Sequence, residues 1–110
     1  MKNLDILAEK MGLSHVCGST DREVCGCYAG DLLSWVMSHA EYGHLWITIM
    51  SNINVVAVAS LCEVACIILA EGVTLDADAL EAATKQDICV FQSKLSTYEL
   101  CALASKHINE

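Results

Sequence analysis

Two short, almost fully apolar runs with a helix-length segment between them constrain the fold of this chain most strongly. Residues 45–50 (LWITIM) and 66–70 (CIILA) carry large apolar side chains, many of them β-branched, on both alternating faces. Such runs are typical of strands in a sheet that helices cover on both sides. Residues 55–64 are long enough for a helix, so this region predicts a strand, a helix and a second strand.

The flanking segments continue this alternation. Helical periodicity and capping residues predict further helices over residues 3–11, from Asp31 to about Gly43, from Asp76 or Asp78, and from Ser96. Extended segments are predicted within residues 15–28 and 89–92. We therefore expect an α/β fold with a central, largely parallel sheet and helices on both faces. Periodicity alone leaves the order of the strands open.

Length and charge narrow the classes of protein to consider. A chain of 110 residues has the size of one domain, so we expect residues 1–110 to form a single folding unit. The formal net charge of −8 repels phosphate backbones and anionic lipids, which argues against nucleic-acid binding. Polar residues inside the apolar region 45–70 argue against a membrane span. Cysteines within apolar stretches and an amino terminus unlike a signal peptide indicate a cytoplasmic protein.

Six segments, taken in order, resemble the DRTGG domain family and cover almost the whole chain. They are residues 21–24 (DREV), 28–33 (YAGDLL), 46–49 (WITI), 54–59 (NVVAVA), 67–72 (IILAEG) and 96–100 (STYEL). The Asp-Arg-Thr-Gly-Gly string that names the family is absent. The chain also resembles the amino-terminal, non-catalytic domain of bacterial HPr kinase/phosphorylase, so the resemblance implies the fold of that domain.

The resemblance implies a function without catalysis. Members of the family occur alone or attached to nucleotide-sensing and catalytic domains, and isolated modules look like homodimers with regulatory or assembly roles. HPr kinase carries its ATP-binding loop in a separate domain, and this sequence has no Gly-x-x-x-x-Gly-Lys-Ser/Thr motif. We therefore expect a regulatory or adaptor module without a cofactor, a homodimer that binds a protein partner or a small ligand such as a nucleotide or another anion.

Two turns are candidate ligand sites. Ser51, Asn52 and Asn54 follow a predicted core strand, open a helix and carry polar groups without a carboxylate, as an anion site requires. Gly30 and Asp31 also precede a helix. We expect Asp31 to cap that helix, and its carboxylate would oppose a phosphate. The turn that contains Ser51, Asn52 and Asn54 is therefore the preferred ligand site.

The cysteines offer an alternative function as a metal or redox protein. His15, Cys17, Cys25 and Cys27 are soft donors that lie close together in the sequence. Their spacing matches no recognised metal-binding pattern, and ordinary burial explains them more simply. The other histidines lack a nucleophile and an acid at supporting spacing, so the sequence indicates no catalytic residue.

Three aromatic residues are candidates for a dimer interface. Trp35 falls outside the predicted inward stripe of its helix, and Tyr42 and Trp46 follow closely in the sequence. Exposed aromatic side chains often mark the surface that contacts a partner. The predicted inward stripe of the helix that contains Trp35 consists of Leu32, Leu33, Val36, Met37 and Ala40.

A third hypothesis for the function is a purely structural dimeric subunit.

Overall fold

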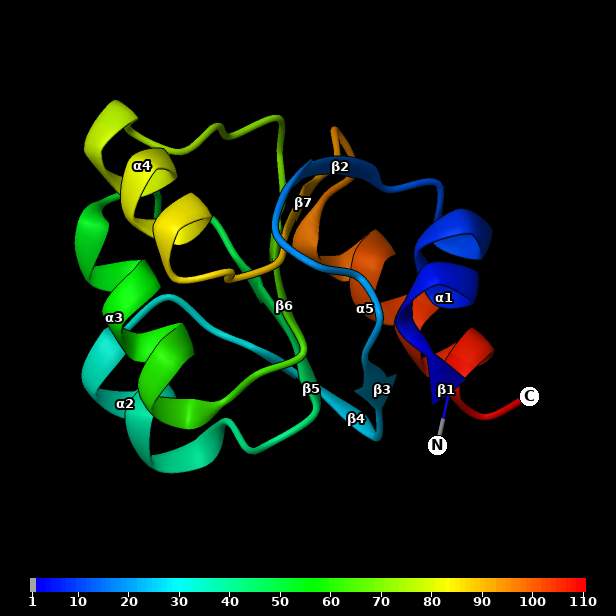
Figure 1. Ribbon diagram of the computed structural model, residues 1–110. Helices are drawn as coiled ribbons and strands as arrows, with labels where there is room; N and C mark the ends of the chain where they lie inside the picture. Colours follow the sequence, from blue (N-terminus) through cyan, green and yellow to red (C-terminus); the bar gives the residue numbers. More distant parts are fainter. Residues whose placement is uncertain (1) are drawn as a thin grey trace.

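A five-stranded sheet forms the centre of the computed structural model, which describes residues 2–110 (Figure 1). Its strands, in spatial order, are β2 (Ser14–Cys17), β7 (Val90–Gln92), β6 (Cys66–Leu69), β5 (His44–Thr48) and β4 (Gly26–Ala29). Strands β4, β5, β6 and β7 run parallel, and β2 pairs antiparallel with β7. The predicted α/β fold with a largely parallel sheet is confirmed.

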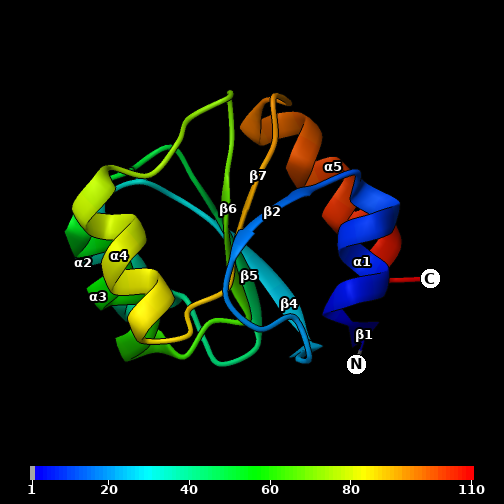
Figure 2. The same cartoon turned by 45° about the horizontal axis from the view of Figure 1, so that its top comes forward.

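Helices cover both faces of the sheet, as two views of the ribbon show (Figures 1 and 2). On one face lie the three helices α2 (Leu33–His39), α3 (Ile53–Cys62) and α4 (Ala77–Lys85). On the other face lie α1 (Leu4–Met11) and α5 (Thr97–Ile108). A small two-stranded sheet pairs β1 (Lys2–Asn3) with β3 (Glu23–Val24) in antiparallel register.

The apolar strands divide their side chains between two cores. All four residues of β6 are buried, and Ile68 packs toward α1 and α5 whereas Ile67 packs toward α2, α3 and α4. In β5 the same alternation sends Ile47 to the first core and Trp46 to the second. Two covered faces explain why these strands are apolar at successive positions.

Several local signals act as predicted. Asn3 caps α1 by accepting a hydrogen bond from the Ile6 amide, and Gly12 ends that helix in the left-handed conformation. Ser96 and Glu99 form the predicted capping box at the start of α5, with both hydrogen bonds at 3.1 Å.

The helix after Asp31 differs from the prediction. α2 begins at Leu33, and the Asp31 carboxylate does not cap it. It accepts hydrogen bonds from the Thr48 hydroxyl at 2.8 Å and the Ile49 amide at 2.9 Å. Two partners on the neighbouring strand therefore replace the local amides as its hydrogen-bond donors.

The predicted inward stripe of α2 is also only partly right. Val36 and Ala40 are buried, but Leu32 is 65% exposed and Met37 is 49% exposed. The helix is short, so only about one side chain per turn reaches the sheet.

Within residues 2–110, no helix combines the length and the apolar composition needed to cross a membrane.

Candidate functional site

The carboxyl ends of the parallel strands meet at one edge of the sheet, and both predicted ligand turns lie there. Gly30 and Asp31 follow β4, and Ser51 and Asn52 follow β5, its neighbour in the sheet. Open parallel sheets bind ligands at this edge, because the loops there converge beyond the strand ends.

The two turns are held to their surroundings by hydrogen bonds. The Thr48 hydroxyl, which has no exposed surface, donates to Asp31 and accepts from the Met50 amide at 3.2 Å. This arrangement joins the loop after β4 to the loop after β5. The structure thus brings Asp31 and residues 48–50 together through contacts that stabilise the edge.

Polar groups of the turn before α3 already form hydrogen bonds within the protein. The Asn52 side chain accepts a hydrogen bond from the Asn54 amide at 2.9 Å and so caps the helix. The Ser51 hydroxyl donates to a carboxylate oxygen of Asp76 at 3.2 Å, which links this turn to the start of α4. That Ser51, Asn52 and Asn54 contact a ligand remains a prediction.

A hollow lies further along the same edge, beside the strand ends of β6 and β7. Its volume is about 270 Å³. We call it the Lys94 hollow, and it is lined by Ser14, Gly72, Thr74, Gln92, Ser93 and Lys94. Lys94 is exposed at the rim of this hollow, and its ammonium group together with the hydroxyl groups of the lining residues is suited to an anionic ligand.

Backbone hydrogen bonds hold the walls of the Lys94 hollow in place. The amide of Gly72 donates to the carbonyl of Ser93 at 2.9 Å, and the amide of Glu71 donates to the carbonyl of Leu95 at 2.9 Å. Gly72 has a φ of 74°, a conformation that glycine adopts without strain. The loops after β6 and β7 are therefore fixed to each other before any ligand arrives.

The residues of the Lys94 hollow were not predicted from the sequence. The signal that was available is the position of Ser93 and Lys94 directly after a predicted core strand. Ser14 belongs to β2, which pairs with β7 across a long sequence separation. Because strand order is not contained in the periodicity, Ser14 could not be placed beside Lys94 from the sequence.

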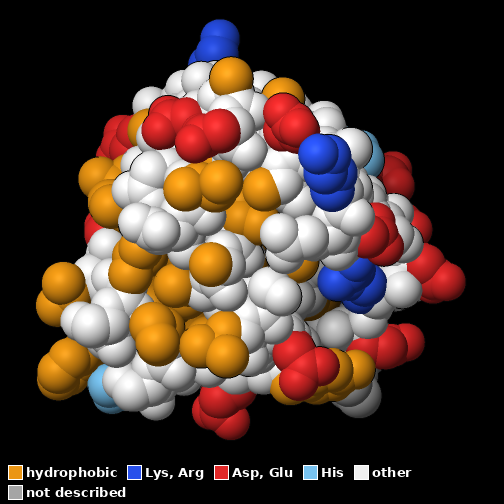
Figure 3. Space-filling view, turned by 60° about the vertical axis from the view of Figure 1, so that its left-hand side comes forward, with side chains coloured by type: hydrophobic (Ala, Val, Ile, Leu, Met, Phe, Trp, Pro, Cys, Tyr) orange, Lys and Arg blue, Asp and Glu red, His pale blue; other side chains and the backbone are white. Residues whose placement is uncertain are grey.

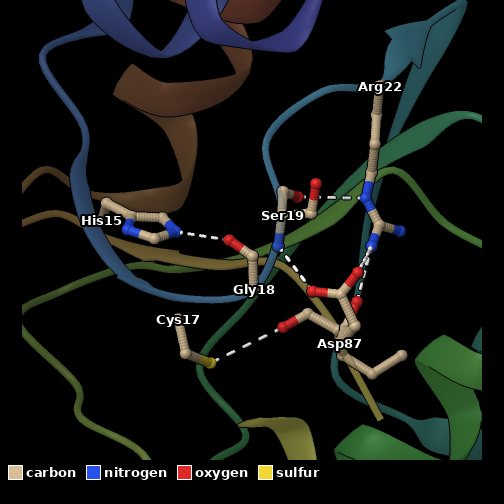
Figure 4. Close-up of polar contacts among 7 residues, drawn as sticks. His15, Cys17, Gly18, Ser19, Arg22 and Asp87 are labelled. Atoms are coloured by element: carbon tan, nitrogen blue, oxygen red, sulfur yellow. Dashed lines mark hydrogen bonds and ion pairs between the residues drawn. The ribbon is translucent and has the colours of Figure 1, made fainter.

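The opposite, amino edge of the sheet is closed by an ion pair (Figure 4). Nη2 of Arg22 lies 3.4 Å from a carboxylate oxygen of Asp87, and its Nε donates to the carbonyl of Ser19 at 3.0 Å. The Asp87 carboxylate also accepts from the Ser19 amide at 2.8 Å. Arg22 belongs to the first segment of the family resemblance, and its contacts here are structural.

Gly18 shows how closely the loop at the amino edge packs. Its φ is 85°, and a Cβ atom at this position would lie 2.3 Å from the carbonyl oxygen of Ile88. Any other residue would therefore force the two backbones apart. The loop of Gly18 therefore fills its part of the amino edge, beside a second hollow of about 250 Å³ that Arg22, Glu63 and Asp87 help to line.

The predicted metal donors do not converge. His15 contacts the carbonyl of Gly18 at 2.8 Å, and the Cys17 thiol donates to the carbonyl of Ile88 at 3.5 Å (Figure 4). The Cys25 thiol donates instead to the carbonyl of Tyr42 at 3.2 Å. In the part of the chain that the structure describes, no group of three or more His, Cys, Asp or Glu side chains could hold a metal ion.

Burial keeps most of the thiols protonated. Desolvation raises the pKa of Cys27 and that of Cys89 to about 12, and it raises the pKa of Cys66 well above its ordinary value. A thiol must lose its proton to act as a nucleophile or a metal ligand. These three thiols are therefore unsuited to redox chemistry at neutral pH.

The three predicted interface aromatics occupy different environments. Trp35 is 58% exposed and stacks on His39 with ring centroids 4.7 Å apart, and Tyr42 is 68% exposed. Trp46 is completely buried, and its ring nitrogen donates to the carbonyl of Gly30 at 3.0 Å. The prediction that Trp46 belongs to a dimer interface is therefore wrong, because β5 directs its side chain into the core.

Fold and site geometry define an α/β domain with loops gathered at the carboxyl edge of a parallel sheet. The family model described as HPr Serine kinase N terminus matches residues 37–108, well over half of the sequence. The chain therefore belongs to this family, whose domains are of the DRTGG type. None of the curated proteins matches the chain.

A solved structure shares the fold. It is the crystal structure of the CBS and DRTGG domains of the regulatory region of Clostridium perfringens pyrophosphatase, complexed with the activator diadenosine tetraphosphate. The TM-score is 0.72 at 16% sequence identity, and the match covers 93% of this chain and 45% of that one. This chain therefore spans less than half of the matched structure, and the likeness concerns the fold.

Proposed function

We propose that this chain is a non-catalytic, cytoplasmic regulatory or adaptor module that forms a homodimer and binds a small anionic ligand. In this proposal residues 1–110 are a single DRTGG-type domain. The observation that carries it is the Lys94 hollow, a preformed space lined by Lys94 and four other polar residues at the edge where open parallel sheets bind ligands. Membership of a family of non-catalytic domains supports the regulatory role.

The lining of the Lys94 hollow favours a phosphorylated ligand. Lys94 supplies a positive charge in a chain whose formal net charge is −8, so an anion is attracted locally and repelled elsewhere. The hydroxyl groups of Ser14, Thr74 and Ser93 can donate hydrogen bonds to phosphate oxygens. The activator in the matched pyrophosphatase structure is a nucleotide with a chain of phosphates, which makes nucleotides the first class to test.

The neighbouring turns extend the proposed site. Ser51 is linked to Asp76 at the start of α4, and Thr74 in the same connection lines the Lys94 hollow. A ligand longer than a single phosphate would meet the Asp76 carboxylate on its way from Lys94 toward Ser51 and Asn52, so only an uncharged part of it fits there. Gly30 and Asp31 lie beyond them, beside β4, where the Asp31 carboxylate would disfavour a second phosphate.

The cysteine alternative receives little support from the structure. The donors His15, Cys17 and Cys25 each contact a different backbone carbonyl, and the pKa of Cys27 is raised to about 12. A metal or redox protein needs thiolates that converge on one point.

Titration of the ¹⁵N-labelled protein with inorganic pyrophosphate, ATP and diadenosine tetraphosphate tests the proposal. We expect amide shifts at Gly72, Thr74 and Ser93, and at least about tenfold weaker binding for Lys94→Ala, because a charged hydrogen bond is lost. Lys106→Ala, an exposed lysine in the last turn of α5, is the matched control and should bind as the unaltered chain does.

Three outcomes would contradict the proposed site. No amide shift with any of the three compounds at millimolar concentration would favour a purely structural dimer. Equal weakening by Lys94→Ala and Lys106→Ala would show that the anion responds only to net charge. Shifts confined to residues 51–54 would move the site to the turn before α3.

A further inference from the structure

Helix α3 presents an uncharged stripe to solvent. Its ten residues, Ile53–Cys62, include no Asp, Glu, Lys, Arg or His. Val55, Val56, Val58 and Ala59 face the sheet and are buried. The side chains left exposed are Ile53, Asn54, Ala57, Ser60 and Leu61. At about 100° per residue they cover roughly 120° of the helix surface, centred on Ala57.

This exposed stripe is symmetric about Ala57. Ile53 and Leu61 lie four residues before and after it, and both are large and apolar. Asn54 and Ser60 lie three residues before and after it, and both can donate and accept hydrogen bonds. When a helix packs antiparallel on its own copy across a two-fold axis, residues equally spaced about the crossing point face each other. The stripe therefore matches its own reversed copy.

A groove runs beside the stripe, between α3 and α4. Its volume is about 500 Å³, and we call it the α3 groove. It is lined by Ile53, Val56, Ala57, Ser60, Leu61, Ala82 and Gln86. Figure 3 shows this side of the molecule, where hydrophobic side chains gather in the middle of the face and acidic side chains lie at its margin. Leu61 is 66% exposed and Ile53 is 44% exposed.

We propose that a second copy of this chain docks here, α3 against α3 and antiparallel, with the two-fold axis at Ala57. The inference rests on the proposed homodimer and locates its interface. In this arrangement Leu61 of each copy packs against Ile53 of the other and enters its α3 groove. Ala57 is small enough for the axes of the two helices to approach to about 8 Å.

Charge favours a second copy over another occupant. Two chains that each carry −8 repel each other, and contact costs least where neither surface is charged. An acidic or basic partner would need charged groups to recognise it, and α3 carries none. Glu63, directly after α3, and Glu81, on α4, border the stripe, so a shifted register would bring carboxylates together.

The five exposed side chains of α3 would form only the centre of a stable interface, which takes about 20–30 residues from each partner. A standard interface takes about 800 Å² from each partner, about a seventh of the 5650 Å² that this chain exposes. The neighbouring helix α2 adds Met37, 49% exposed, and Trp35, 58% exposed, to the same side of the sheet. Trp35 stacks on His39, which stacks on Tyr28 of the edge strand β4, so it points away from α3, and its place in a dimer interface stays a prediction.

Sedimentation equilibrium of the unaltered chain and of Ala57→Glu tests the proposal. The unaltered chain should have twice the monomer mass of 11.9 kDa, and Ala57→Glu should weaken the dimer at least about 100-fold, because it buries two unpaired carboxylates. Ala102→Glu makes the same change on an exposed position of α5 and should remain a dimer. Circular dichroism checks that both variants fold. Leu61→Gln, which adds no charge, should also weaken the dimer.

The outcomes separate this inference from the proposed function. A dimer that survives both Ala57→Glu and Leu61→Gln would overturn the α3 interface and leave the proposed homodimer intact. A monomer of the unaltered chain at all concentrations would overturn the dimer itself, whereas ligand binding at Lys94 is measured independently. Equal dissociation by Ala57→Glu and Ala102→Glu would also overturn the inference, because added charge alone would explain it.

Discussion

Two layers of helices cover the sheet of this protein, and they differ in the side chains that they expose to solvent. α1 and α5 direct Leu4, Leu7 and Leu100 inward and expose charged side chains such as Glu9 and Lys106. α2 and α3 bury equally apolar residues, yet their seventeen residues include no Asp, Glu, Lys or Arg. Covering the sheet requires only one apolar side of a helix.

The difference indicates what each layer is for. α1 and α5 expose mostly polar and charged side chains besides Ile6 and Tyr98, and an ion pair of 2.9 Å joins Lys10 to Glu110. In the other layer α4 carries the ion pair of Glu81 with Lys85, whereas α2 and α3 expose apolar side chains and no Asp, Glu, Lys or Arg. Contiguous exposed apolar surface marks an interaction site in a soluble protein.

The largest expected effect compares two tryptophans. Trp46→Ala removes a fully buried side chain and its hydrogen bond to Gly30, and should lower the free energy of unfolding by about 3–5 kcal/mol. Trp35→Ala, at an exposed position, should change it by less than about 0.5 kcal/mol. Urea unfolding at low protein concentration measures both. Equal losses would show that Trp35 is also part of the core.

A pair of leucines compares the two layers directly. Leu100, on α5, has no exposed surface, and Leu100→Ala should cost about 2–5 kcal/mol of stability. Leu61, on α3, is mostly exposed, so Leu61→Ala should leave the stability of the monomer nearly unchanged. The same variant should raise the dimer dissociation constant, measured by sedimentation. If Leu61→Ala changed neither quantity, α3 would be an ordinary solvent-facing helix.

The smallest expected effect on stability concerns Glu110, which follows α5. Hydrogen bonds from His107 and Lys10 lower the pKa of Glu110 to about 2. A carboxyl group with a lowered pKa stabilises the fold above its ordinary value of 4.5, and this stabilisation is lost as the pH falls toward 2. Glu110→Gln should therefore lose slightly less stability than the unaltered chain between these pH values. Identical urea midpoints across that range would contradict the pKa shift.

Much of the fold follows from local sequence. The apolar runs placed β5 and β6, and Ser96 with Glu99 placed the start of α5, because these signals act within a few residues. Asp31 was misplaced because Thr48 and Ile49, distant in sequence, donate to its carboxylate. Local capping rules cannot weigh such tertiary partners.

The candidate site was less predictable than the fold. Both ligand turns were expected and lie at the carboxyl edge, but the Lys94 hollow depends on the antiparallel pairing of β2 with β7. Trp46 was placed at an interface because its neighbours in sequence are exposed, whereas strand alternation buries it. Sites built from separate strands require the strand order, which periodicity does not contain.

The most direct test of the α3 interface is disulfide trapping at its two-fold axis. In the proposed dimer the Cα atoms of residue 57 approach to about 5 Å, a separation that a disulfide can bridge. Ala57→Cys, oxidised with excess oxidised glutathione, should run as a covalent dimer on a non-reducing gel and revert with reductant. The unaltered chain and Ala102→Cys should remain largely monomeric under these conditions. If Ala57→Cys gives no more covalent dimer than these controls, α3 does not form the interface.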